Sequence, residues 1–157
     1  MALWGYHALT APFGSSASAV TTPPPSDGPS CGAGQQQKIV KYVSRHEVEV
    51  SVYNAGTRSG RAQATMNQLE RAGFAVGAIG NAPSSMVIKK AAVHTKKADL
   101  TAATLVARAL GKGTPVVIDE TQDLGPGIDV FIGDSFRKLD PKAPTQLKLP
   151  QPKIVCG

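Results

Sequence analysis

The sequence predicts an α/β domain, a two-layer sandwich with elements in the order β-α-β-β-α-β-β. Two helices are expected to pack on one face of a four- or five-stranded sheet. Three observations support this class: short runs rich in valine and isoleucine, two stretches of small apolar residues at helical spacing, and glycine-containing turns between them. Of the 157 residues, 41% are hydrophobic and 18% are charged, a balance that allows one hydrophobic core.

The first half of the predicted domain begins with a short extended edge segment, Lys38–Val43. A strand is expected at Glu47–Tyr53, where valines alternate with charged or polar residues. One face of this strand should be buried and the other exposed to solvent. The turn at residues 54–60 is rich in Asn and Gly. The helix that follows spans Arg61–Gly73 and stops at its final glycine. A second strand is expected at Phe74–Gly80.

The second half of the predicted domain repeats this pattern weakly. A third strand is expected at Met86–His94 and a second helix at Lys97–Leu110, with a stripe of alanines and leucine on its buried side. Two more strands are expected at Pro115–Asp119 and Ile128–Gly133, separated by a Gly-Pro-Gly turn. Strand–helix–strand units of this kind favour right-handed crossovers between parallel strands.

The chain divides into three parts by composition. Residues 1–44 are expected to form a juxtamembrane Pro/Ser-rich tether and the edge segment, residues 45–136 the folded domain, and residues 137–157 a basic C-terminal tail. Trp4 and Tyr6 are aromatics of the type that favours a membrane–water interface. We therefore expect a membrane helix ahead of this sequence, which itself contains no apolar run long enough to span a bilayer.

The net charge of +6 is concentrated in the two flanks of the domain. The segment from Cys31 to Arg45 carries three cations and no acid, and the tail carries five cations against Asp140. Such a distribution favours an anionic partner, such as a wall polymer, lipid headgroups or nucleic acid, although solubility alone remains an alternative. The candidate basic patch consists of Lys38, Lys41, Arg45, Arg137, Lys138, Lys142, Lys148 and Lys153.

The two cysteines, Cys31 and Cys156, lie in these same basic flanks. Two cysteines without a nearby histidine cannot form a structural zinc site, so a disulfide is the favoured interpretation. The alternative is a pair of free thiols in a cytosolic protein. If the disulfide forms, it clasps the tail to the end of the tether and joins the two basic flanks into one patch.

Two segments carry a family resemblance. Residues 48–60 form a strand ending in an Asn- and Gly-rich turn, and residues 69–82 form a helix end, a Gly-Phe step and a strand. Together they resemble the LytR C-terminal domain family, and the likeness extends from about Glu47 to Phe136. The second half of the match, including Asp129–Gly133, is less specific.

The resemblance implies an extracytoplasmic role in maintaining the bacterial cell envelope. Domains of this family usually follow a LytR–CpsA–Psr phosphotransferase domain, which ligates glycopolymers to the cell wall, and this sequence contains no such domain. The chain is more similar to the stand-alone, membrane-tethered members of actinobacteria, including mycobacterial proteins of envelope integrity. The family implies no known ligand.

The turn after the first strand is the best candidate for a binding loop. It joins a strand end to a helix start, so free N–H groups and Arg58 could hold an anion, with Ser59 as the helix N-cap. The alternative is that these residues only shape the turn. The candidate residues are Asn54, Gly56, Thr57, Arg58, Gly60 and, after the second strand, Asn81.

Two local motifs resemble catalytic or nucleotide-binding patterns only in part. Gly133–Phe136 resembles the nucleophile block of GDS-type esterases, but no histidine follows His94 to act as a base for Ser135. Leu110–Thr114 lacks the first glycine of a phosphate loop and follows a helix instead of preceding one, which is typical of a helix C-cap.

The acidic and histidine side chains do not predict a metal site. The three histidines, His7, His46 and His94, are scattered, and we expect each at the surface or at an edge. The spacing of the acidic group matches no calcium loop, which favours a solvated face. We expect no metal and no cofactor. The acidic residues concerned are Asp119, Glu120, Asp123, Asp129 and Asp134.

The sequence therefore predicts a non-enzymatic domain of the cell envelope that binds a cell-wall polymer or an envelope protein. One alternative is a regulatory partner of a LytR–CpsA–Psr phosphotransferase. Another is a basic nucleic-acid-binding domain, which a disulfide would disfavour because cytosolic thiols are usually kept reduced. A hydrolase using Ser135 is the weakest alternative.

Overall fold

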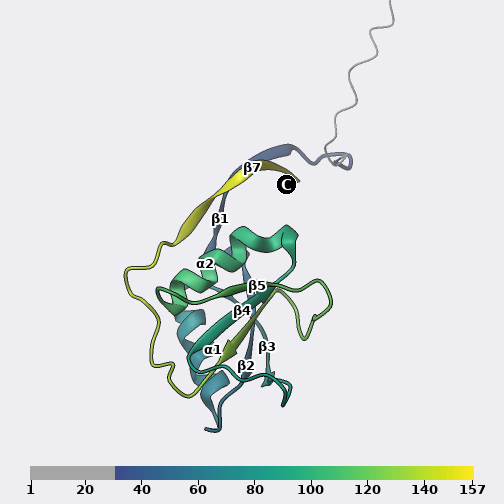
Figure 1. The fold of residues 1–157 in the computed structure, drawn as a ribbon. Helices are drawn as coiled ribbons and strands as arrows, with labels where there is room; N and C mark the ends of the chain where they lie inside the picture. The colour runs from purple at the N-terminus through teal and green to yellow at the C-terminus, as the bar shows by residue number, and fades with distance from the viewer. Residues whose placement is uncertain (1–30) are drawn as a thin grey trace, which may run out of the picture.

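The computed structural model describes residues 31–157. The predicted tether at residues 1–30 lies outside this range. The described chain forms a five-stranded sheet with two helices, from which a two-stranded arm extends (Figure 1). The elements are β1 Gln37–Ser44, η1 Arg45–Glu47, β2 Glu49–Asn54, α1 Arg61–Arg71, β3 Ala75–Asn81, β4 Ala91–Thr95, η2 Lys97–Asp99, α2 Leu100–Leu110, β5 Val116–Ile118, β6 Ile128–Ile132 and β7 Gln146–Cys156.

The large sheet has the strand order β3-β2-β6-β4-β5. β2 pairs in parallel with β3 and β6, β4 pairs in parallel with β5, and β4 runs antiparallel to β6. Two strand–helix–strand units, β2–α1–β3 and β4–α2–β5, are thus joined through β6 at the centre. This arrangement confirms the predicted fold class, with five strands in the sheet.

Both helices cover the same face of the sheet. Val50 and Val52 of β2 and Val130 of β6 alternate toward one side, and they join Met66 of α1 and Leu105 of α2 in a single buried core. All five side chains are at most 2% exposed. Burial of this continuous apolar surface is the main stabilising contribution to the layered fold.

Several predicted boundaries are wrong. The second helix begins at Leu100, after the short η2 turn, and not at Lys97. The third strand begins at Ala91 and not at Met86, because the carbonyls of Lys89 and Lys90 accept hydrogen bonds from the turn after β6. The N-cap of α1 is Gly60 and not Ser59, since the backbone enters the helix through a left-handed residue at φ 77°. Such a conformation favours glycine.

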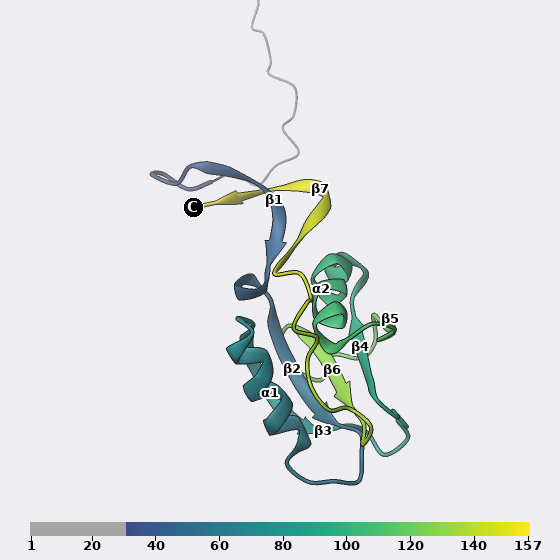
Figure 2. The same cartoon turned by 90° about the vertical axis from the view of Figure 1, so that its left-hand side faces the viewer.

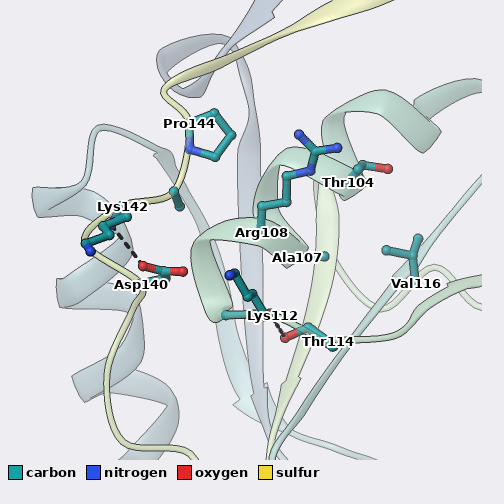
Figure 3. Close-up of a pocket in the computed structure, with 12 residues that line it drawn as sticks. Thr104, Ala107, Arg108, Lys112, Thr114, Val116, Asp140, Lys142 and Pro144 are labelled. Carbon is teal, nitrogen blue, oxygen red and sulfur yellow. Dashed lines mark hydrogen bonds between the residues drawn. The ribbon is translucent and has the colours of Figure 1, made fainter.

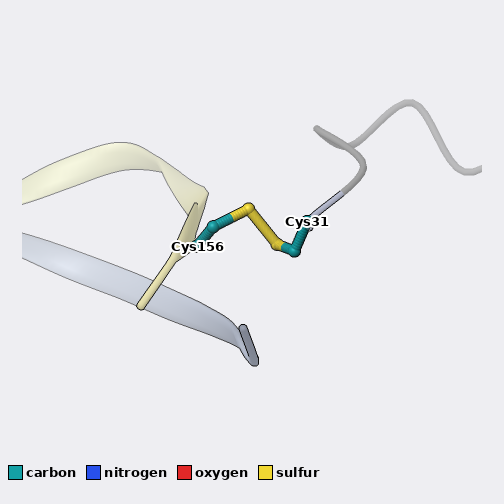
Figure 4. The surroundings of a disulfide bond; sticks show 2 residues. All are labelled: Cys31 and Cys156. Atoms are coloured by element: carbon teal, nitrogen blue, oxygen red, sulfur yellow. A yellow bond between two sulfur atoms is a disulfide. The ribbon is translucent and has the colours of Figure 1, made fainter. Parts of the chain in front are cut away.

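The two basic flanks pair with each other as the two strands of the arm. β1 and β7 run antiparallel, with Ile39 opposite Ile154 and a register shift between Val40 and Tyr42. β1 corresponds to the predicted edge segment Lys38–Val43, whereas β7 falls in the segment predicted to be a tail. A disulfide between Cys31 and Cys156 closes the end of the arm, with 5.4 Å between the two Cα atoms, and confirms the predicted bridge (Figure 4).

The segment from β6 to β7 runs back along the helices to the arm (Figure 2). We call residues 137–145 the strap. The Leu139 amide donates to the side chain of Gln68 on α1, and the Asp140 amide donates to the Ala109 carbonyl on α2. The strap is therefore anchored to both helices before the chain enters β7.

Candidate functional site

The predicted binding loop between β2 and α1 is filled by a carboxylate of the same chain. Asp134, in the turn after β6, accepts hydrogen bonds from the amides of Thr57 and Arg58 and from the Thr57 hydroxyl at 2.8 Å. These bonds, above all that of the Thr57 amide, lower the pKa of Asp134 from its ordinary value. The N–H groups expected to hold an external anion thus already have an anionic partner.

The remaining residues of this loop shape the turn. The Asn54 side chain accepts from the Gly56 amide and donates to the Arg58 carbonyl. Asn81 of β3 lies directly beside Asn54 in the sheet, as its position after the second strand suggested. Gly56 packs so closely on Asp134 that a Cβ atom would collide with the carboxylate. This geometry matches the alternative in which these residues only form the turn.

The predicted basic patch separates into several places, and one member is structural. The Arg45 guanidinium donates to the carbonyls of Ala72, Ala143 and Pro144, and it lies over the Phe74 ring at 5.5 Å. Arg45 therefore locks the strap and the end of α1 together. It does not contribute to an open cationic surface.

The other predicted cations are exposed. Lys38 and Lys41 lie on β1, and Lys148 and Lys153 lie on β7, so the arm carries four lysines and no acidic residue. Arg137 and Lys138 begin the strap next to β6, at some distance along the chain from the arm. Lys142 lies further along the strap, where it lines a pocket.

That pocket, which we call the cationic pocket, has a volume of about 340 Å³ and opens between the C-terminal end of α2 and the strap. Figure 3 shows Arg108 on α2 and Lys112 just beyond its end, beside the part of the strap that carries Asp140 and Lys142. Asp140 is the one acidic residue lining it, and its carboxylate accepts the Lys142 amide at 2.9 Å. Three cations and one carboxylate give the lining a net charge of +2.

Arg108 and Lys112 are not among the residues of the predicted basic patch. The segment Leu110–Thr114 was correctly interpreted as a helix end: the Gly111 amide donates to carbonyls of the last turn, and the Thr114 hydroxyl donates to the Gly111 carbonyl. Only the fold brings this end beside the strap, which arrives from about 30 residues further along the sequence.

The face of the sheet opposite the helices carries a second group of side chains. Ser51, Tyr53, Asp129 and Phe131 point to this side and are buried, and His94 packs its ring edge-on against Phe131 at 4.7 Å. No helix covers this face within the described chain. The loop from β5 to β6, residues 119–127, covers it instead, with Ser51 Oγ donating to the Pro126 carbonyl at 2.7 Å.

The acidic residues expected on a solvated face have separate roles. In the β5–β6 loop, the Asp119 carboxylate accepts a hydrogen bond from the Thr121 hydroxyl. This bond lowers the pKa of Asp119 from its ordinary value. Lys96 pairs with Asp123 at 2.7 Å, which raises the pKa of the lysine. Asp129 is 5% exposed, so the expectation of a solvated carboxylate is wrong at this position. Burial raises the pKa of Asp129 from its ordinary value.

His94 lies inside the sheet and not at its edge, and its side chain is half-buried. β4 lies between β6 and β5 in the sheet, and the Nδ1 atom of His94 is buried without a hydrogen-bond partner. Within residues 31–157, no three His, Cys, Asp or Glu side chains are grouped to hold a metal ion. Ser135 lies exposed in the turn after β6, where its amide donates to the Lys89 carbonyl.

Comparisons with known proteins agree with this fold. The family model described as LytR cell envelope-related transcriptional attenuator matches residues 47–136. The chain is similar to the soluble domain of a conserved hypothetical secreted protein of Mycobacterium marinum, an Rv2700 ortholog, at 22% identity and a TM-score of 0.54, over 64% of this chain and 68% of that one. It is also similar to the C-terminal domain of RV0431, at 21% identity and a TM-score of 0.39, over 85% and 96%.

No curated protein matches the sequence significantly. In residues 31–157, neither helix has the length and apolar character needed to cross a membrane.

Proposed function

Because the chain belongs to the LytR C-terminal domain family, we propose that it is a non-enzymatic, extracytoplasmic domain that docks an anionic polymer of the cell wall. The family itself is cell envelope-related. The proposal includes a membrane tether formed by the Pro/Ser-rich segment ahead of the arm. This tether would hold the domain between the membrane and the wall.

Two observations support an extracytoplasmic location. The Cys31–Cys156 disulfide is of the kind that persists in oxidising compartments and is rare in the cytosol. The similar Mycobacterium marinum domain belongs to a protein described as secreted. The same disulfide disfavours the nucleic-acid-binding alternative.

The observation that carries the polymer proposal is the cationic pocket. Arg108, Lys112 and Lys142 surround one opening, and Asp140 is the one carboxylate among its lining residues. Phosphate and carboxylate groups are recognised by such clusters through charge-assisted hydrogen bonds, and arginine can bind them in a bidentate manner. The four lysines of the arm extend this positive surface along a projecting ribbon that a linear polymer could follow (Figure 1).

A pull-down with purified cell wall tests the proposal. We expect the full chain to sediment with the wall at low salt, and the variant Arg108→Glu/Lys112→Glu/Lys142→Glu to lose at least about tenfold in affinity. Charge reversal of Lys148 and Lys153 on the arm should weaken binding by a smaller factor, because these two lysines do not line the cationic pocket and two charges are reversed instead of three.

A matched control changes the same amount of charge elsewhere. Arg71, Arg137 and Lys138 are exposed and do not line the cationic pocket, so Arg71→Glu/Arg137→Glu/Lys138→Glu should keep most of the binding. If both sets of variants lose the same amount of affinity for the wall, binding depends on net charge alone. That result would contradict a role for the pocket. Failure of the unmodified chain to bind wall at low salt would contradict the polymer proposal altogether.

A second candidate function is docking to an envelope protein, including regulation of a LytR–CpsA–Psr phosphotransferase. The arm favours it, since Ile39 is 62% and Tyr42 46% exposed, and Ile154 lies opposite Ile39. Such exposed apolar side chains on a strand pair are typical of protein-binding edges. Photo-crosslinking from position 39 in intact cells should recover such a partner reproducibly, and a probe at exposed Glu70 serves as the control.

A further inference from the structure

Four buried polar side-chain atoms have no hydrogen-bond partner in the described chain: the Tyr53 hydroxyl, and one atom each of Asp129, Gln122 and His94, whose side chains line one pocket. Asp129 uses Oδ2 to accept the Leu124 amide at 3.1 Å, while its Oδ1 has no hydrogen bond. The Oε1 atom of Gln122 and the Nδ1 atom of His94 are in the same condition. Since buried polar groups are almost always hydrogen-bonded, these atoms indicate a site for a donor from outside the chain.

The three side chains line one pocket, which we call the polar pocket. It has a volume of about 230 Å³ and lies between the end of β4 and the β5–β6 loop. Asp99 and Asp123 add two further carboxylates, and Lys96 is the one cation in the lining. The lysine is paired with Asp123, so the carboxylates of Asp99 and Asp129 give the pocket a net charge of −2 with His94 neutral.

The walls of the polar pocket are held in place by the fold. Ser51 Oγ donates to the Pro126 carbonyl and accepts the Ala78 amide, which ties the loop to β2 and β3. Gly125 fits so tightly over Ser51 and the Tyr53 hydroxyl that a Cβ atom would collide with both. The contact between His94 and Phe131 orients the imidazole ring. A preformed site of this kind binds without a large ordering cost.

The chemistry of the unpartnered atoms selects the ligand. A carboxylate oxygen and an amide oxygen are acceptors, and His94 Nδ1 is a third acceptor when the imidazole proton is on Nε2. A metal ion is disfavoured because the described residues contain no group of three suitable ligands. A primary ammonium has three N–H donors, one positive charge and no acceptor, which matches three acceptors in a negative pocket.

We propose that the polar pocket binds a primary ammonium group, with Asp129 as its counter-ion and Gln122 and His94 as neutral acceptors. The raised pKa of the buried Asp129 carboxyl is consistent with a group that lacks its cationic partner. The site shares no lining residue with the cationic pocket, which is bordered by α2 and the strap. It therefore does not depend on wall-polymer binding, and either proposal can fail alone.

The test is a titration of the ¹⁵N-labelled full chain followed by NMR. Ethylammonium chloride should shift the amide signals of Leu124 and Asp129 in a saturable manner. Tetramethylammonium chloride, which has the same charge but no N–H donor, should leave them nearly unchanged. N-acetyl-lysine methylamide distinguishes the source of the amine: tighter binding than ethylammonium indicates a lysine side chain of a protein, and equal binding indicates a small free amine.

Two variants in the pocket and one outside it sharpen the result. Asp129→Asn keeps an oxygen for the Leu124 amide but places an NH₂ group in the pocket, so ethylammonium affinity should fall at least about tenfold. Gln122→Glu adds a second anionic acceptor and should tighten binding by several fold. Glu70→Gln, at an exposed position on α1 that lines neither pocket, should bind like the unmodified chain.

The proposal is overturned if ethylammonium produces no saturable shift in the folded chain. It is also overturned if tetramethylammonium gives the same shifts, because the response would then report charge screening alone. Unchanged affinity in both Asp129→Asn and Gln122→Glu would place the binding elsewhere.

Discussion

At the scale of single residues, Arg45 joins three parts of the molecule. Its half-buried guanidinium donates to carbonyls at the end of α1 and in the strap, and its distance to the Pro144 carbonyl is 3.1 Å from Nε. A planar fork with five donors can serve several acceptors at once, whereas an ammonium cannot reach the same set. Arg45 therefore fixes the strap that forms one wall of the cationic pocket.

We expect Arg45→Lys to lower the free energy of unfolding by about 2 kcal/mol, since the carbonyls it leaves are partly buried. Urea unfolding followed by circular dichroism measures the change. Arg137→Lys, at an exposed position of the strap, should stay within about 0.5 kcal/mol of the unmodified chain. An equal effect in both variants would show that Arg45 has no special structural role.

Asp134 makes the free energy of unfolding depend on pH in the acidic range. Its pKa is lowered in the folded state, so the unfolded chain binds the proton more tightly than the native chain. The stabilisation is therefore complete above the ordinary pKa of 3.8 and is lost as the pH falls through the lowered pKa. The stability difference between the unmodified chain and Asp134→Asn should be constant above about pH 5 and shrink steadily below about pH 4.

Urea unfolding of both proteins across this pH range measures that difference. Glu70→Gln, at an exposed position on α1, controls for the loss of one negative charge. A difference between Asp134→Asn and the unmodified chain that does not change with pH would mean that the carboxylate does not hold the loop through its charge.

The contrast between the cysteines and the aspartates shows what single residues reveal in a sequence. Cys31 and Cys156 could be paired because they were the only two candidates for each other. Asp129 and Asp134 resemble any surface aspartate in sequence. Their burial and partners are set by strands and loops that meet only in the fold, as with Asp134 and Thr57, which are 77 residues apart.

At the scale of elements, the arm is a two-stranded ribbon whose stability depends on the Cys31–Cys156 disulfide. An isolated strand pair is marginally stable in water, and within residues 31–157 β1 pairs only with β7. The disulfide closes the chain over a separation of 125 residues, for which the chain-entropy estimate is about 5 kcal/mol as an upper limit.

We expect Cys31→Ser/Cys156→Ser to open the outer part of the arm while the five-stranded sheet persists. Amide hydrogen exchange should accelerate strongly at Ile39 and Ile154 and remain slow at Val52 and Val130. Reduced, unmodified protein should behave in the same way as the variant. Unchanged protection of the arm from exchange would show that strand pairing alone holds the arm together without the disulfide.

The β5–β6 loop approaches β2 closely at two glycines, Gly125 and Gly127. Gly127 has a φ of 80°, and a Cβ atom there would collide with the Glu49 backbone. Gly127→Ala should cost more than about 2 kcal/mol of unfolding free energy, because both strain and a clash are added. Gly113→Ala has the same sign of φ but open space, so it should cost only about 1 kcal/mol. Equal costs in chemical denaturation would contradict the close seating of this loop.

Elements with a clear hydrophobic periodicity in the sequence were predictable. Elements that are strands only because they pair with a distant segment were not. β2 and α1 follow from alternating valines and from helical spacing that ends at a glycine. β7 was missed because it contains two prolines and four residues that are charged or amide-bearing between its apolar positions, a composition typical of a tail. Its strand conformation comes from pairing with β1 and from the disulfide, and neither is local information.

At the scale of the whole molecule, the two faces of the sheet have different chemistry. The helix side ends in the cationic pocket and continues into the lysine-bearing arm. The other side holds the polar pocket beneath a loop. Net charge alone suggested an anionic partner, but only the fold shows that the cations gather at two places instead of one patch.

The central claim is that this domain docks an anionic wall polymer through the cationic pocket. The most direct measurement is the affinity of the full chain for purified wall polymer as a function of salt concentration, for the unmodified chain and for Arg108→Glu/Lys112→Glu/Lys142→Glu. We predict measurable binding that weakens steeply as salt screens the charges, and a much smaller salt dependence in the variant. Binding that is independent of salt, or equal in the two proteins, would contradict the claim.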